Sequence, residues 1–217
     1  MKMRAPIEAT GVDERIRNAA FALLLRDRAP IEPAELARIV GLDPSAAAGV
    51  FEGLARSGRI DRDAGGRITG AAGLSLEHGP HALTLPEGRF RTWCAYDALG
   101  IAAALGADAA IETACGQCGA TIRLAVLAGT PQRRDPERLW LAAGGDDLRA
   151  DFCTPTVLLC SQAHADAWAQ GHGQQGELLD LEAGAILGGE HWATCAAAAR
   201  MLPDGDSKPA QTLNPES

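Results

Sequence analysis

The chain has 217 residues, of which 47% are hydrophobic and 4% aromatic, and its formal net charge is -8. This length allows one or two domains with a hydrophobic core, which must be filled largely by small side chains. An acidic surface repels nucleic acid and anionic membranes, so neither is expected as a main partner.

The sequence shows no export or membrane signal. Residues 1–11 are charged and lack the apolar segment of a secretory signal. The chain also lacks the run of about 18 apolar residues that a transmembrane helix needs. We therefore expect a cytoplasmic protein, whose six cysteines are free thiols or metal ligands rather than disulfides.

Helices are predicted at residues 12–28, 31–40 and 43–58, because apolar side chains recur there at helical spacing. Gly41 ends the second helix and Asp43 begins the third. Strands at 59–61 and 67–69, joined by a glycine turn, then form a hairpin. Three helices followed by a hairpin are typical of a winged helix.

A winged helix raises the question of DNA binding. Through Arg67 there are eleven basic and ten acidic residues, and the third helix carries Arg56 as its single basic side chain. That composition makes a poor phosphate-binding surface. A structural or lid role is favoured over DNA binding.

The remainder predicts an α+β fold, in which a mixed β-sheet catalytic part with flanking helices follows the winged-helix-like part. The expected domains are 1–76 and 77–202, with a disordered tail at 203–217, which is rich in Pro, Asp, Gly and Ser. The segment 152–160 is the most apolar strand candidate, although Pro155 favours an edge or a bulge. The other predicted elements are strands at 74–76, 82–85, 90–93, 109–113, 121–127 and 138–142, and helices at 94–105, 164–170 and within 181–199.

Cys94 and Asp97 are the first candidates for chemistry. Their spacing of three places both on one face of the predicted helix. A thiol at a helix N-terminus is expected to have a lowered pKa, and a thiolate binds soft metals. The alternatives are a buried cysteine that only packs and a solvated acid in the first helical turn.

The string Trp-Cys-Ala-x-Asp-x-Leu at 93–99 resembles the organomercurial lyase (alkylmercury lyase) family, in which this cysteine and aspartate are catalytic. Asp151-Phe152-Cys153 is similar to the family segment that carries the second catalytic thiol. Looser similarity covers the N-terminal part, the strands after Cys94, and 166–168 (Asp-Ala-Trp). The chain departs from the family in having Thr154 after the second thiol and an additional cysteine, Cys118.

The resemblance implies protonolysis of a carbon–mercury bond, with Cys94 and Cys153 as mercury ligands and Asp97 as proton carrier and further mercury ligand. It implies organomercurials as substrates, no organic cofactor or resident metal, and small thiols or a mercuric reductase as acceptors of Hg(II). Two alternatives are a metal-responsive DNA-binding regulator and a thiol-based metal-binding protein without lyase activity.

Cys115-x-x-Cys118-Gly119 is half of a zinc-knuckle motif. Zinc would need Cys94, Cys153, Cys160 or a histidine to complete four ligands, and a plain hairpin without stoichiometric zinc is favoured. Cys160 and Cys195 are interpreted as packing residues. The five histidines show no ligand spacing and are expected on the surface or in loops.

Overall fold

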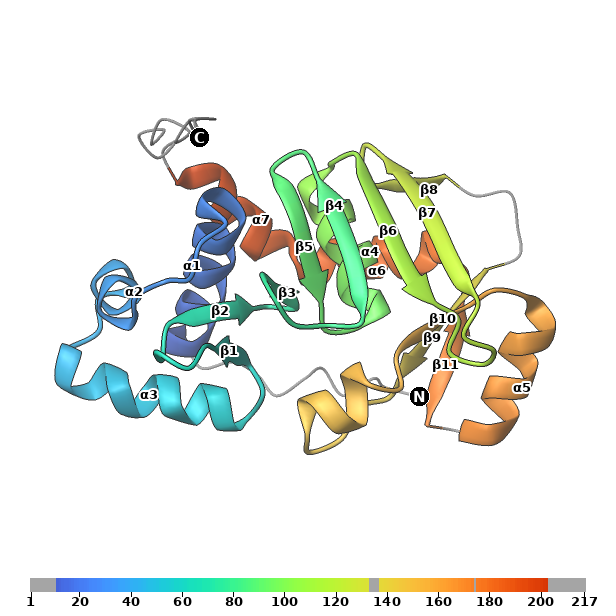
Figure 1. Ribbon diagram of the computed structural model, residues 1–217, viewed down its shortest axis with the longest axis horizontal. Coiled ribbons are helices and arrows are strands. Elements are labelled where there is room, and N and C mark those ends of the chain that lie inside the picture. The colour runs from blue at the N-terminus through green and yellow to red at the C-terminus, as the bar shows by residue number, and fades with distance from the viewer. Residues whose placement is uncertain (1–10, 133–136, 174, 203–217) are drawn as a thin grey trace, which may run out of the picture.

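The computed structural model describes residues 11–132, 137–173 and 175–202. The tail at 203–217, which was predicted to be disordered, lies outside these residues. So does most of the segment 1–11, which was predicted to carry no export signal. Figure 1 shows the N-terminal helices at one end, a large sheet backed by helices in the middle, and a small sheet with its own helix at the other end.

The N-terminal part begins with three helices, as predicted: α1 (Gly11–Asp27), α2 (Pro33–Val40) and α3 (Pro44–Arg56). Gly41 ends α2 with a φ of 70°, a conformation that costs glycine little. The Asp43 side chain accepts the backbone N–H of Ser45 at 2.8 Å and so begins α3. Strands β1 (Ile60–Arg62) and β2 (Ile68–Ala71) follow. The winged-helix classification of this part, and the domain boundary after residue 76, stay predictions.

The large sheet has eight strands in the order β1-β2-β3-β5-β4-β6-β7-β8. All its pairs are antiparallel, because short turns join most neighbouring strands. The prediction of helices with a sheet is therefore confirmed, but the expected mixture of strand directions is wrong for the described residues. The remaining strands are β3 (Leu74–Ser75), β4 (His81–Leu85), β5 (Gly88–Thr92), β6 (Ala109–Ala114), β7 (Thr121–Leu127) and β8 (Thr130–Gln132).

Two helices, α4 (Ala95–Leu105) and α6 (Leu181–His191), lie behind the large sheet (Figure 1). Ile122, Leu124 and Val126 alternate with exposed residues along β7, which shows that one face of the sheet is buried. The helices approach closely at two glycines, since a Cβ on Gly100 would lie 2.9 Å from the Cα of Gly188. The small residues of α4 thus let it lie buried between the sheet and α6.

The second sheet has the order β10-β9-β11, built from β10 (Val157–Leu159), β9 (Arg138–Ala142) and β11 (Gly176–Leu179). It carries α5 (Gln162–His172), while α7 (Ala193–Met201) packs against α1. The predicted continuous strand at 152–160 is wrong. Instead, a π-helical segment, η1 (Leu148–Cys153), is followed by the short β10. Asp147 caps the first turn of η1 by accepting the N–H groups of Arg149 and Ala150.

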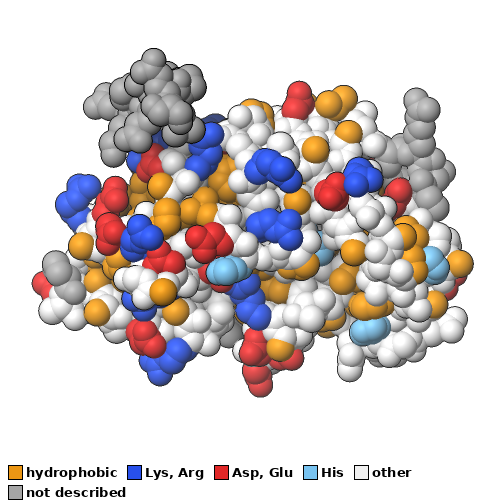
Figure 2. Space-filling view, viewed as in Figure 1, with side chains coloured by type: hydrophobic (Ala, Val, Ile, Leu, Met, Phe, Trp, Pro, Cys, Tyr) orange, Lys and Arg blue, Asp and Glu red, His pale blue; other side chains and the backbone are white. Residues whose placement is uncertain are grey.

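The N-terminal part is joined to the rest by specific contacts. The indole of Trp192 donates to the backbone oxygen of Ala72 at 2.7 Å, and Trp93 donates to Asp61 at 2.7 Å. On the face in Figure 2, acidic and basic side chains are intermixed over the region of α1–α3. Among the described residues, no helix is long and apolar enough to cross a membrane.

Candidate active site

Cys94 stands at the junction between β5 and α4. It is the N-terminal capping residue of α4, with extended backbone angles (φ -139°, ψ 171°), and it is completely buried. Two backbone hydrogen bonds fix this junction: Trp93 N–H donates to Gly73 at 3.1 Å, and Ala95 N–H donates to Thr156 at 3.3 Å. The predicted position of Cys94 at a helix start is therefore confirmed.

Cys153 reaches the same place from the last turn of η1. The bond from Ala95 to Thr156 ties the start of α4 to the segment that follows η1. The sulfurs of Cys94 and Cys153 and a carboxylate oxygen of Asp97 all lie within 4.8 Å of one another, and all three residues are buried. The structure thus brings together the three residues selected from the sequence, although Cys153 comes from a helical turn rather than a strand.

The thiol of Cys94 is held in its protonated form. Burial raises the pKa of Cys94 well above the usual value of a thiol, and the neighbouring Cys153 thiol and Asp97 carboxylate add to this rise. A hydrogen bond from the backbone N–H of Asp97 acts in the opposite direction but does not compensate. The prediction of a lowered pKa is therefore wrong, because desolvation outweighs the helix N-terminus.

Asp97 is a buried carboxyl group, with 3% of its surface exposed, so the alternative of a solvated first-turn acid is excluded. Burial raises the pKa of Asp97 to about 6. Hydrogen bonds from the N–H and thiol of Cys94 and the charge of Arg149 limit the rise. A carboxyl group with a pKa near 6 can both accept and return a proton at neutral pH.

Gly73 packs closely against this carboxyl group. A Cβ at residue 73 would lie 2.5 Å from the Cγ of Asp97, and the backbone φ of 83° also favours glycine. No local sequence pattern indicates this role, because Gly73 belongs to a turn between β2 and β3 and meets Asp97 only in the folded chain.

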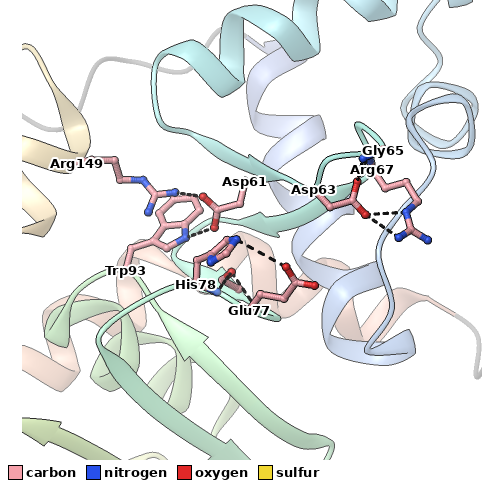
Figure 3. Close-up of polar contacts among 9 residues, drawn as sticks. Asp61, Asp63, Gly65, Arg67, Glu77, His78, Trp93 and Arg149 are labelled. Carbon is pink, nitrogen blue, oxygen red and sulfur yellow. Dashed lines mark hydrogen bonds and ion pairs between the residues drawn. The ribbon is translucent and has the colours of Figure 1, made fainter.

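Figure 3 shows a polar cluster in which Asp61 of β1 links the two segments that carry the thiols. Asp61 accepts a hydrogen bond from the Trp93 indole at 2.7 Å and forms an ion pair with Arg149 of η1 at 2.6 Å. The Arg149 guanidinium also lies over the Trp93 ring, 3.3 Å from its centroid. One side chain of the N-terminal part thus holds Trp93, which directly precedes Cys94, and Arg149, which lies in the same helical segment as Cys153. Sequence analysis missed this role of Asp61.

A pocket of about 350 Å³ lies beside the site. Trp93 and Thr154, which adjoin Cys94 and Cys153 in sequence, form part of its wall. The complete lining is Pro80, His81, Trp93, Thr113, Ala114, Cys115, Gly116, Thr154 and Val157.

The other four cysteines lie outside the cluster of Cys94, Asp97 and Cys153. Cys195 is buried, as predicted, and its thiol donates to the Asn18 side chain of α1 at 3.1 Å. Cys115, Cys118, Cys160 and His164 form a second cluster whose sulfur and nitrogen atoms lie within 4.8 Å of one another. Cys160 packs against the core, as interpreted, but it is also a member of this cluster. The expectation that the histidines lie on the surface or in loops is wrong for His81, which is 4% exposed in β4.

Comparison with known proteins identifies relatives of this chain. The model of the MerB alkylmercury lyase family matches residues 74–194. Over 133 residues the chain is 29% identical to alkylmercury lyases of Bacillus cereus and Clostridium butyricum. This match covers 59% of the chain and 60% of each relative, so it spans less than two thirds of their length.

The fold agrees with this assignment. A crystal structure of the mercury-bound form of MerB2 is similar to this structure with a TM-score of 0.74 at 24% sequence identity, covering 89% of this chain and 93% of that one. The family match spans more than half of the chain and contains Cys94, Asp97 and Cys153. The chain therefore belongs to the alkylmercury lyase family.

Proposed function

We propose that this protein is an organomercurial lyase, which cleaves a carbon–mercury bond by protonation and releases a hydrocarbon and Hg(II). The observation that carries the proposal is the buried convergence of the Cys94 and Cys153 sulfurs with the Asp97 carboxylate within 4.8 Å. Two soft sulfur ligands suit a soft ion, and the carboxyl group stands where a proton must be moved. Membership of the alkylmercury lyase family and the similarity to a mercury-bound MerB2 support the same function.

In the first step Cys94 captures the substrate R–Hg⁺. The Cys94 thiol gives its proton to the Asp97 carboxylate, and its sulfur forms a bond to mercury. The raised pKa of the thiol opposes deprotonation in the free protein, so the proton leaves as the sulfur–mercury bond replaces the sulfur–hydrogen bond. The pKa of Asp97 near 6 makes it a suitable acceptor.

In the second step Cys153 adds to mercury and releases its own proton. The second sulfur increases electron density on the carbon bonded to mercury. Asp97 delivers a proton to that carbon, the carbon–mercury bond breaks with its electron pair going to the new carbon–hydrogen bond, and R–H leaves. In total R–Hg⁺ and two thiols yield R–H, one proton, and Hg(II) bridged by two thiolates.

The surroundings of the site support this assignment. We propose that the organic group occupies the pocket of about 350 Å³ that is lined by Trp93 and Thr154, the sequence neighbours of Cys94 and Cys153. Burial excludes water from Asp97, which directs its proton to the bound carbon. We propose that the reaction uses no organic cofactor, and that small thiols or a mercuric reductase in the cytoplasm remove Hg(II) from the two sulfurs.

The test is incubation of the purified protein with phenylmercury and an excess of small thiol, with benzene measured by gas chromatography. Catalytic benzene release that depends on Cys94, Cys153 and Asp97 supports the proposal. Stoichiometric mercury binding without benzene would instead indicate a thiol-based metal-binding protein. Salt-sensitive, sequence-specific binding of a DNA duplex without benzene would indicate a regulator.

A further inference from the structure

The second cysteine cluster takes no part in the proposed reaction. Cys115 and Cys118 belong to the turn between β6 and β7, Cys160 follows β10, and His164 lies in the first turn of α5. Each contributes one ligand atom, and these four atoms lie within 4.8 Å of one another. Three separate elements therefore direct three thiols and an imidazole at one point.

Two of three short distances within the cluster are close to those of a tetrahedral zinc site, and all four ligand atoms lie within 4.8 Å of one another. The sulfurs of Cys118 and Cys160 are 3.8 Å apart, and Nδ1 of His164 lies 3.8 Å from the Cys115 sulfur and 3.1 Å from the Cys160 sulfur. In a tetrahedral zinc site, with Zn–S of about 2.3 Å and Zn–N of about 2.0–2.1 Å, ligand atoms stand roughly 3.6–3.8 Å apart. On zinc binding the 3.1 Å contact between His164 and Cys160 would have to lengthen.

The backbone around Cys115 is arranged like a zinc knuckle. Gly119 N–H donates to the Cys115 carbonyl at 2.8 Å and Gly119 adopts a φ of 73°, which closes the turn. The backbone N–H of Cys160 donates to the Cys115 sulfur at 3.4 Å, a contact that favours a thiolate ligand. Gly116 N–H donates to Leu158 at 2.9 Å and so brings this turn against β10.

A disulfide explains the cluster less well. A Cys118–Cys160 bond would require the sulfurs to move from 3.8 Å to about 2.05 Å. It would also leave the Cys115 thiol and the His164 ring outside the bond, although His164 Nδ1 lies 3.8 Å from the Cys115 sulfur and 3.1 Å from the Cys160 sulfur. A four-ligand ion uses all four groups.

We propose that Cys115, Cys118, Cys160 and His164 bind one Zn²⁺ in a closed structural site. The ion fastens the β6–β7 turn of the eight-stranded sheet to β10 and α5 of the small sheet. Four protein ligands leave no open position for a water molecule or a substrate, which is typical of a structural rather than a catalytic site. The cluster shares no residue with Cys94, Asp97 and Cys153, although Cys115 also lines the pocket that contains Trp93 and Thr154.

The experiment uses the whole chain, expressed and purified without exposure to mercury. The cells are supplemented with zinc, and the buffers are reducing and contain no chelator. We expect about one zinc per chain by mass spectrometry. The Cys118→Ser variant should lose it and still fold, since Cys118 is exposed. His164→Ala should also lose it, whereas His78→Ala, a change at a histidine whose side chain is 64% exposed outside the cluster, should keep it.

A double variant, Cys94→Ser with Cys153→Ser, distinguishes the two sites. It should retain the zinc, and Co²⁺ substituted for zinc should show the visible bands of a tetrahedral ion and a thiolate charge-transfer band in both this variant and the wild type. Removal of zinc should lower the Tm in the wild type but leave the Tm of Cys118→Ser unchanged.

Three results would overturn the proposal. The first is less than about one tenth of a zinc per chain in the wild type under these conditions. The second is zinc that disappears with Cys94 and Cys153 but survives Cys118→Ser. The third is a count of four free thiols instead of the six in the sequence, which would reveal a Cys118–Cys160 disulfide. None of these depends on benzene release, so failure here and failure of the lyase proposal are separable.

Discussion

The carboxylate of Asp97 accepts the backbone N–H of Cys94 at 2.8 Å, and this hydrogen bond turns it toward the two thiols. The same contact caps the first turn of α4. One side chain therefore orients the helix that carries it and holds a proton acceptor beside the sulfur. The consequence is that capping and proton transfer at residue 97 can be separated only by a substitution that retains the hydrogen bond.

Asp97→Asn is that substitution. The amide oxygen can still accept the N–H of Cys94, so folding should be retained, but the amide cannot carry a proton. We expect mercury binding to persist and carbon–mercury cleavage to fall by roughly 10²–10⁴-fold. Single-turnover benzene release and mercury titration measure the two properties separately. Cleavage at the wild-type rate would show that water or another acid is the donor.

Replacement of either thiol should have the larger effect. Cys94→Ser and Cys153→Ser each remove one mercury ligand, and we expect turnover to fall on the order of 10³-fold or more while circular dichroism shows a folded protein. Cys195→Ser is the matched control, because Cys195 is also buried but lies against Asn18. Near-normal turnover in either active-site variant would eliminate the two-sulfur mechanism.

The sequence predicted the Cys94–Asp97 pair well, because both residues lie in one helix and helical spacing is local. It also located most strands of the large sheet as short segments separated by turn residues. Cys153 was found through the family resemblance alone. Its local structure was misassigned, because a short apolar stretch has no periodicity that separates a strand from a helical turn.

The sequence indicated the Cys115–Cys118 half of the second cluster, but it left open which residues complete it, and this had a different reason. Cys160 and His164 are four residues apart, but Cys160 precedes α5, and its nearness to Cys115 depends on the hydrogen bond between Gly116 and Leu158. That contact joins segments more than forty residues apart in sequence. The strands β8 and β11 were missed because each is short and one contains Pro131. Long-range pairing of this kind leaves no local pattern.

Gly73→Ala should misplace the Asp97 carboxylate. The new Cβ would lie 2.5 Å from Cγ of Asp97, so the carboxyl group must shift from its position beside the thiols. We expect kcat/KM to fall by about 10²-fold, as for a misplacement of about 1 Å. Gly41→Ala is the control, since Gly41 has a similar φ of 70° but open space around it. Equal activity in the two variants would show that Gly73 does not position Asp97.

Asp61→Ala should loosen the segments that lead to both thiols. The ion pair with Arg149 is partly buried, with 16% of the Asp61 side chain exposed, and Asp61 also accepts from Trp93. We expect a loss of about 2–3 kcal/mol in the free energy of unfolding. Glu112→Ala breaks the exposed pair with Arg123 and should cost less than about 0.5 kcal/mol. Urea denaturation measures both, and equal losses would contradict the proposed link.

His81 should make the protein less stable in weak acid. It is 4% exposed, its Nδ1 lies 2.6 Å from the Thr113 hydroxyl, and burial together with the charge of Arg91 lowers its pKa from 6.5 to about 4. The unfolded chain binds a proton at higher pH than the folded chain does. The stabilisation is therefore complete above pH 6.5 and is lost as the pH falls toward 4.

The size of the effect follows from the shift in pKa, and it amounts to about 3 kcal/mol once the pH is below 4. Urea denaturation of the wild type and of His81→Gln between pH 4 and 7 isolates this contribution. The glutamine amide can still pair with Thr113 but does not titrate, so the stability difference between the two proteins should shrink or reverse as the pH falls. A difference that stays constant over this range would show that His81 titrates normally in the folded protein.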